Sequence, residues 1–160
     1  MILRIIAVGK IREHHWQDGL ADYLRRLKPY ARVETLIISE AKITDGKSPQ
    51  DVQKALGNEA YSILQRVEKL GGFIVALDRQ GKEFESLELA QWLEDRMIEG
   101  CSEISWIIGG PLGLDSSVLS KANLIMSFSR LTFPHQMVHL ILLEQLYRCF
   151  RIIHNEPYHK

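Results

Sequence analysis

The sequence is poor in cysteine, has no excess of charge of either sign and lacks a long hydrophobic run. Its two cysteines, Cys101 and Cys149, form no CxxC pair and have no metal-ligand spacing, so a cysteine-based metal or redox site is not indicated. The opening segment MILRIIAVGK places its charges inside a short apolar run and does not resemble a signal peptide. We therefore expect a protein of the reducing cytoplasm.

Charge and hydropathy exclude further classes of protein. Twenty Lys and Arg balance twenty Asp and Glu, so no overall field favours association with nucleic acid or membranes, and such a partner must contact a local basic patch. The longest apolar stretch, Met137 to Leu143, is interrupted by His139 and is far shorter than the roughly 20 residues that cross a bilayer. We expect no transmembrane segment and no membrane partner.

The chain is expected to form a single domain, residues 1–160. At 46% hydrophobic it can build one core but not comfortably two, and no internal repeat or Pro/Ser linker divides it. Runs rich in Ile and Val alternate with segments of helical period, which is typical of an α/β fold with a mostly parallel sheet. Strands are predicted at 3–9, 33–39, 72–78, 104–110 and 123–129. Helices are predicted at 15–27, from Ser48, from a cap at Ser86, as a short piece before the fifth strand, and at 134–153.

The last predicted helix is apolar on almost every side over its first half, where Gln136 and His139 are its main polar residues. A helix of this kind must be covered nearly all round. In so small a domain a homodimer interface is the favoured cover. The alternative is a central helix that its own chain buries.

His135 and His139 have the i, i+4 spacing by which zinc proteases hold their metal. Those enzymes need Glu directly after the first histidine as the general base, and Gln136 stands there. No third ligand is suggested, so we predict no metal. The pair is expected to be structural or to face a ligand.

Three loops at the same end of neighbouring strands predict a ligand pocket. The stretches LDRQGKEF (77–84), IIGGPLGL (107–114) and SFSRLTFPHQ (127–136) each follow a predicted strand. Ligands of parallel α/β sheets bind beyond the carboxyl ends of the strands, and glycines there let backbone approach a ligand. The spacing matches neither GxGxxG nor GxxxxGK[ST], so dinucleotide and nucleoside-triphosphate binding are not supported. The exposed backbone of these loops could contact an adenine edge and a ribose, while Phe128 or Phe133 gives apolar contact.

The C-terminal segment NEPYHK carries titratable and basic residues. Tyr158, His159 and Lys160 follow Arg148 and Arg151 closely in the chain. Arginine beside aromatic groups suits contacts with phosphates or bases of a nucleic acid. The basic residues between 25 and 28 are equally consistent with a solvated helix face.

These motifs together resemble one family. The stretches AVGK, IIGGPLGL, MSFSRLTFPHQ, LLEQLYR and PYHK are similar to those of the bacterial ribosomal large subunit methyltransferase H family of the SPOUT superfamily, and the similarity runs from Met1 to Lys160. The resemblance implies methylation of N3 of a pseudouridine in 23S rRNA, at the family's position 1915, with S-adenosylmethionine as cofactor. It also implies a SPOUT-type α/β fold, Rossmann-like with a C-terminal trefoil knot, and a homodimer, whereas topology rules alone predict an unknotted sheet.

By motif position, the resemblance assigns the cofactor to the three loops. The cofactor-binding residues would be Leu77, Gly109, Phe128, Ser129, Arg130, Leu131, Thr132 and Phe133. His139 stands where the family pattern has Arg after PHQMV, and histidine is only partly charged near neutral pH, which weakens any phosphate or intersubunit contact there. With Arg148, Arg151 and Lys160 it forms the predicted set of substrate-binding residues.

The expected chemistry leaves three tasks to the protein. A sulfonium methyl is already activated, so the protein must align the reactants, exclude water and remove the imide proton from the attacking nitrogen. His159 is the predicted proton acceptor because histidine titrates near 6.5, and Tyr158 is predicted to orient the base or stack on it. The neutral charge favours an assembled ribosome over naked rRNA as substrate.

Two other functions stay open from the sequence. One is a catalytically silent dimer of the same fold that binds the ribosome or RNA, and His139 is the feature that favours it. The other is a SPOUT enzyme acting on tRNA, which would need a basic surface that the neutral composition does not offer.

Overall fold

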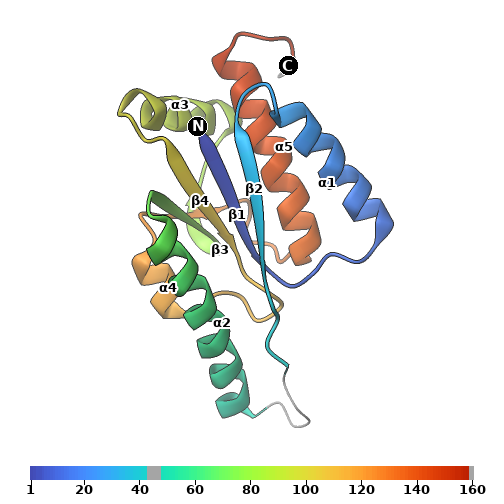
Figure 1. Cartoon of the computed structure of the whole chain (residues 1–160), viewed down its shortest axis with the longest axis vertical. Helices are drawn as coiled ribbons and strands as arrows, with labels where there is room; N and C mark the ends of the chain where they lie inside the picture. Colours follow the sequence, from blue (N-terminus) through green and yellow to red (C-terminus); the bar gives the residue numbers. More distant parts are fainter. Residues whose placement is uncertain (43–47, 159–160) are drawn as a thin grey trace.

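The chain forms a parallel five-stranded sheet with helices on both faces (Figure 1). The computed structural model describes residues 1–42 and 48–158, so part of the polar loop expected at 40–50, together with His159 and Lys160, lies outside the described residues. The elements run β1 (Ile2–Val8), α1 (His14–Leu27), β2 (Arg32–Ile38), α2 (Pro49–Leu70), β3 (Phe73–Glu83), α3 (Ser86–Ile98), β4 (Glu103–Ile108), α4 (Ser116–Lys121), β5 (Leu124–Ser127) and α5 (His135–Ile153). The predicted α/β class and order of elements are confirmed.

The strands lie in the order β2-β1-β4-β3-β5, and every neighbouring pair is parallel. Residues 104–108 of β4 are buried without alternation, because helices cover both faces of the sheet. Since the strands are parallel, the loops that follow β3, β4 and β5 leave the sheet at the same edge.

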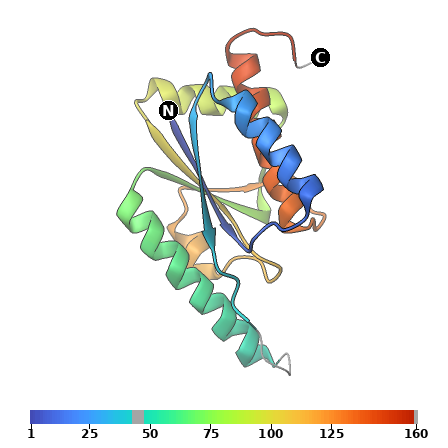
Figure 2. The same ribbon diagram turned by 45° about the vertical axis from the view of Figure 1, so that its right-hand side comes forward.

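Two apolar layers hold the helices on the sheet (Figures 1 and 2). On one face, α5 packs between α1 and α3 over the larger core, in which Trp106 and Phe150 are fully buried. On the other face, α2 and α4 cover a smaller core around Ile63 and Val118. Each fully buried side chain of this size stabilises the fold by about 1.5–3 kcal/mol.

Helix starts follow the capping chemistry of the sequence, with one correction. The Ser48 hydroxyl accepts the Asp51 amide at 3.1 Å, and α2 begins at the next residue, as predicted. The predicted cap at Ser86 is wrong by one residue. Glu85 is the cap of α3, because its carboxylate accepts an amide of the first turn while Glu88 accepts the Glu85 amide at 2.9 Å.

Strand β3 is longer than predicted and is interrupted by a bulge. Leu77 and Lys82 both pair with Met126 of β5, so the residues between them, 78–81, leave the ladder. A Cβ on Gly81 would lie 2.6 Å from the carbonyl carbon of Met126, so only glycine lets the bulge return against β5. The bulge therefore holds Asp78 and its neighbours over the carboxyl edge of the sheet.

Helix α5 is buried unevenly along its length. Its second half is buried by the protein's own chain, with Leu146, Cys149 and Phe150 at most 1% exposed. Four apolar residues of its first half are only partly covered: Met137, Val138, Leu140 and Ile141. The alternative of a helix covered by its own chain therefore describes the second half of α5, whereas the first half keeps accessible apolar surface.

Candidate functional site

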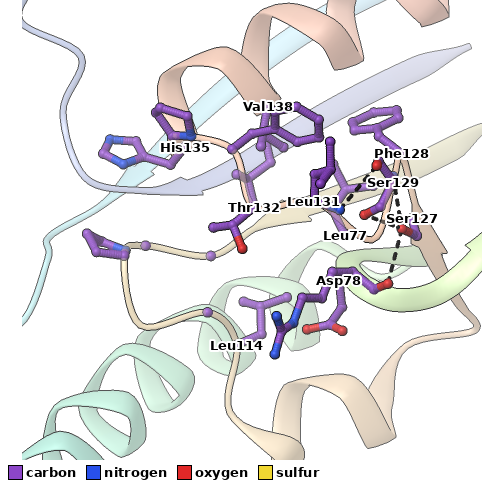
Figure 3. A pocket seen from close by; sticks show the side chains of 18 of the residues that line it. Leu77, Asp78, Leu114, Ser127, Phe128, Ser129, Leu131, Thr132, His135 and Val138 are labelled. Atoms are coloured by element: carbon purple, nitrogen blue, oxygen red, sulfur yellow. Dashed lines mark hydrogen bonds between the residues drawn. The ribbon is translucent and has the colours of Figure 1, made fainter.

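A cavity of about 990 Å³ lies where the loops after β3, β4 and β5 meet the start of α5 (Figure 3). Phe128, Leu131 and Thr132 lie on one side of it, and Asp78 and Leu114 on the other. Its size is at the upper end of the ~300–1,000 Å³ typical of small-molecule sites. The three loops predicted to converge on one pocket do so.

The wall supplied by β4 is made of backbone. The Gly113 amide donates to the Gly110 carbonyl at 3.0 Å and closes a tight turn, with Gly113 at φ +83°. A Cβ on Gly109 would lie 2.6 Å from the Gly113 carbonyl oxygen, a distance that no side chain tolerates. Glycine is thus required where this loop faces the cavity.

The wall supplied by the loop after β5 is held by serine hydroxyls. The Ser127 Oγ lies 3.3 Å from the Arg79 carbonyl and 3.0 Å from the Ser129 carbonyl, and it accepts the Ser129 amide at 3.1 Å. The Ser129 Oγ accepts the Leu131 amide at 3.1 Å. These bonds, dashed in Figure 3, tie the loop to the β3 bulge.

Seven of the eight residues predicted to bind cofactor line this cavity: Leu77, Gly109, Phe128, Ser129, Leu131, Thr132 and Phe133. The eighth, Arg130, lines a neighbouring cleft of about 570 Å³ with Arg79, Gln80, Gly81 and Glu83. We refer to this second hollow as the arginine cleft. Arg79 and Gln80 line both hollows and so form the ridge between them.

Sequence reasoning did not single out Arg79 and Gln80 as site residues. The signal available was the polar run RQGKE after an apolar strand. This run predicts a loop. It does not reveal that Leu77 and Lys82 both pair with Met126, so that Arg79 and Gln80 lie on a bulge outside the ladder.

The two histidines of HQMVH have different surroundings. His135 lines the cavity, and its Nε2 has no hydrogen-bond partner among the described residues. His139 is buried, and burial, reinforced by the nearby His135, lowers its pKa to about 4. A buried neutral imidazole does not fit the predicted contact of His139 with substrate, because a phosphate cannot reach it. Within the described part of the chain, no three side chains of metal-binding type lie together.

A second polar site lies along the other half of α5. The Tyr158 hydroxyl donates to Glu144 Oε1 at 3.2 Å, and Arg148 Nε donates to the same oxygen at 3.1 Å. The Tyr158 ring packs edge-on against the Tyr147 ring, with 4.9 Å between the ring centroids. The Tyr158 hydroxyl lies 3.4 Å from the Tyr23 hydroxyl. We call these five residues, Tyr23, Glu144, Tyr147, Arg148 and Tyr158, the tail cluster.

The tail cluster keeps the hydroxyl of Tyr158 protonated. Burial, the hydrogen bond with Tyr23 and the Glu144 carboxylate all raise the pKa of Tyr158 well above its usual value. The phenol is therefore protonated at neutral pH and serves as a donor, not as a base. Arg151 anchors the same segment through an ion pair with Glu156 at 2.7 Å, so both arginines predicted to bind substrate hold the C-terminal segment in place.

The cavity and the tail cluster are separated along α5. His135 begins the helix at the cavity and Arg148 lies thirteen residues later, a rise of about 20 Å at 1.5 Å per residue. Tyr158 does not line the cavity, and His159 and Lys160 lie outside the described residues. The described residues of one protomer thus do not unite the predicted cofactor site with the predicted catalytic segment.

Comparison with known proteins identifies the family of the chain. A family model described as "Predicted SPOUT methyltransferase" matches residues 1–159. The chain belongs to the SPOUT methyltransferase family. Within it, the chain is 48% identical over 158 residues to the ribosomal RNA large subunit methyltransferase H of Moorella thermoacetica, covering 99% of this chain and 98% of the relative. It is 45% identical over 161 residues to the protein of that name from Symbiobacterium thermophilum, with full coverage of both. The resemblance read from the motifs is confirmed.

Solved structures support the fold. A probable methyltransferase from Bordetella pertussis matches with a TM-score of 0.54 at 15% identity, over 92% of this chain and 95% of its own. A probable methylase family protein from Haemophilus influenzae matches with a TM-score of 0.53 at 13% identity, over 99% of this chain and 70% of its own. At such identities the likeness shows the fold alone.

None of the described helices of this SPOUT family member has the length and apolar character needed to cross a bilayer.

Proposed function

We propose that this SPOUT methyltransferase uses S-adenosylmethionine to methylate N3 of a pseudouridine in 23S rRNA, at the family's position 1915, on the assembled ribosome. The observation that carries the proposal is the cavity built by three strand-end loops and lined by seven residues of the family's cofactor motifs. The names of the full-length relatives support rRNA of the large subunit as the substrate.

The cavity fits a cofactor of this size and chemistry. Its wall after β4 includes the backbone of Gly109 and Gly110, which offers polar groups for an adenine edge and ribose hydroxyls. Leu114, Phe128 and Val138 supply apolar walls. When bound, S-adenosylmethionine supplies an activated methyl group. The loops hold it in place and exclude water, which supplies the proximity and orientation that the transfer needs.

Proton removal is assigned to the C-terminal segment. Tyr158 stays protonated in the tail cluster, so it orients this segment and offers a hydrogen bond instead of accepting the imide proton. His159, the next residue, keeps the proposed role of proton acceptor because its ordinary pKa suits transfer near neutral pH.

We further propose that the active enzyme is a homodimer, in which the C-terminal segment of one protomer completes the cavity of its partner. Among the described residues of one protomer, the separation of about 20 Å along α5 leaves the cavity without Tyr158. The first half of α5, where Met137, Val138, Leu140 and Ile141 are only partly covered, offers apolar surface for the interface. The C-terminal trefoil knot of the family is part of the same proposal.

The proposal is tested by mass spectrometry of 23S rRNA from cells that lack this protein. We expect loss of one methyl group on one pseudouridine, restored by the plasmid-borne gene. Unchanged rRNA would refute the proposed reaction. Calorimetry then separates the rival: heat on titration with S-adenosylmethionine is expected, and its absence would favour a silent RNA-binding dimer.

The substrate form is tested by comparing purified ribosomes with deproteinised rRNA, both from cells that lack this protein. The net charge of zero predicts weak binding to naked RNA, so methyl transfer should require the assembled particle. A marked preference for free rRNA would contradict this part of the proposal.

A further inference from the structure

The arginines of the described chain divide into those with carboxylate partners and those without. Seven form an ion pair within 4.0 Å: Arg4, Arg25, Arg26, Arg32, Arg96, Arg148 and Arg151. Among the described residues, no such pair is made by Arg12, Arg66, Arg79 or Arg130. Two of these four, Arg79 and Arg130, are exposed and line the same hollow, the arginine cleft.

The placement of both arginines is built into the backbone. Arg79 stands on the β3 bulge, which Gly81 allows to pack against β5. Arg130 stands on the loop after β5, which Ser127 and Ser129 hold. The Ser127 Oγ also lies 3.3 Å from the Arg79 carbonyl, so the two arginine-bearing segments are joined directly. Their guanidinium groups approach one cleft from two fixed loops.

The cleft adjoins the proposed methyl-transfer cavity. Arg79 and Gln80 line both hollows, so a ligand in the cleft would lie beside whatever occupies the cavity. The chain has no net charge, and an RNA-binding surface on such a protein must be a local one. Exposed guanidinium groups that are free of carboxylates are the usual partners of phosphate oxygens, which they bind by paired hydrogen bonds.

We propose that the arginine cleft binds a backbone phosphate of the RNA substrate, next to the nucleotide that enters the cavity. This inference rests on the proposed function, since it takes RNA as the substrate. It moves Arg130 from the predicted cofactor site to substrate binding, and it adds Arg79, which the motifs did not indicate. Gln80 offers an amide donor to the same phosphate.

Glu83 also lines the cleft and gives the proposal an internal check. Its carboxylate makes no ion pair within 4.0 Å with Arg79 or Arg130 among the described residues, so it does not neutralise them. It does repel an incoming phosphate. Replacing Glu83 by Gln should therefore change RNA affinity in the direction opposite to loss of an arginine.

The test measures binding and methylation of ribosomes purified from cells that lack this protein, using Arg79→Gln, Arg130→Gln and the double variant. Each single change should raise the Kd and the KM for ribosomes about 5- to 10-fold, with kcat within about twofold. Arg130→Gln, whose arginine lies outside the lining of the cavity, should also leave the affinity for S-adenosylmethionine within about twofold. The slope of log Kd against log salt should fall by about one for each phosphate that the variant no longer binds. Glu83→Gln should lower the Kd, and the lysine variants of both arginines should restore most of the binding.

The matched control is Arg66→Gln with Lys69→Gln, which removes two positive charges from α2 and should leave the Kd unchanged. An unchanged Kd in the Arg79→Gln/Arg130→Gln variant, or a control that weakens binding equally, would overturn the cleft proposal. If the wild-type protein binds ribosomes through these arginines but transfers no methyl group, the proposed reaction fails while the cleft stands. Loss of affinity for S-adenosylmethionine in Arg130→Gln would instead place Arg130 in the cofactor site and overturn the cleft proposal.

Discussion

The two ends of α5 build their sites in different ways. The cavity at its start is walled by glycine backbone and apolar side chains on loops of three strands. The tail cluster on its second half consists of long polar and aromatic side chains that hold one another through Glu144. A backbone-walled cavity depends on shape and is destroyed when a single Cβ intrudes, whereas a side-chain cluster shares its interactions among several groups and weakens gradually.

The difference also separates the two tasks of methyl transfer. The cavity is held by bonds within its own loops, such as those of Ser127 and Ser129, which suits the proposed binding of a cofactor. The tail cluster keeps the Tyr158 hydroxyl protonated, so that Tyr158 serves as a hydrogen-bond donor. Substitutions at the cavity should therefore act on cofactor affinity, and substitutions in the tail cluster on turnover.

The largest effect is expected from Gly109→Ala at the cavity. The added Cβ would lie 2.6 Å from the Gly113 carbonyl oxygen, so the loop must shift and the backbone wall is displaced. Affinity for S-adenosylmethionine should fall by about 100-fold or more, equivalent to about 2.7 kcal/mol, as measured by calorimetry. Gly57→Ala in α2 is the control, because nothing lies within 4 Å of its new Cβ. Normal affinity in Gly109→Ala would refute the account of a backbone-walled cofactor site.

A smaller effect, confined to turnover, is expected from Tyr158→Phe in the tail cluster. The change removes the hydroxyl that donates to Glu144 at 3.2 Å and keeps the ring against Tyr147. Loss of one hydrogen bond to a charged acceptor predicts a fall in kcat of about tenfold, with unchanged affinity for S-adenosylmethionine. The control is Tyr61→Phe, at an exposed tyrosine whose hydroxyl accepts a hydrogen bond from the Gln65 amide. This change should leave both quantities unchanged. A fall in cofactor affinity in Tyr158→Phe would erase the distinction between the two sites.

The smallest effect at neutral pH is expected from replacing His139, which is buried in α5 between the two sites. In the unfolded chain His139 takes up a proton near pH 6.5, but in the fold only near pH 4. The unfolded state therefore binds more protons between these values, and the free energy of unfolding falls as the pH drops through this window. The difference between these two pKa values corresponds to about 3 kcal/mol of unfolding free energy.

Urea unfolding at pH 7, 5.5 and 4 measures this dependence. The variant His139→Leu should remove that part of the pH dependence, whereas His15→Gln, at an exposed position, should retain it. Identical pH profiles for the wild type and His139→Leu would show that the burial of His139 does not shape the acid stability of the fold.

How much the sequence predicts differs between the two sites for the same physical reason. The cavity was predictable because glycines and apolar strands report backbone geometry directly, and parallel strands bring their following loops to one edge. The position of Arg79 was not predictable, since it depends on the β3 bulge and the pairing of both Leu77 and Lys82 with Met126. The burial of His139 was only one of two open readings, because two histidines at i and i+4 in an apolar helix do not indicate which face α1 and α3 cover.

One mixed dimer tests the proposal that the C-terminal segment of one protomer completes the cavity of its partner. Two differently tagged chains are co-expressed, one carrying Gly109→Ala and the other lacking residues 158–160, and the heterodimer is purified through both tags. Each parental homodimer should be inactive, and each chain should melt as a folded protein. The heterodimer holds one intact composite site, so methyl transfer to ribosomes should reach about half of the wild-type rate per dimer. An inactive heterodimer would show that each protomer completes its own site and would contradict the account.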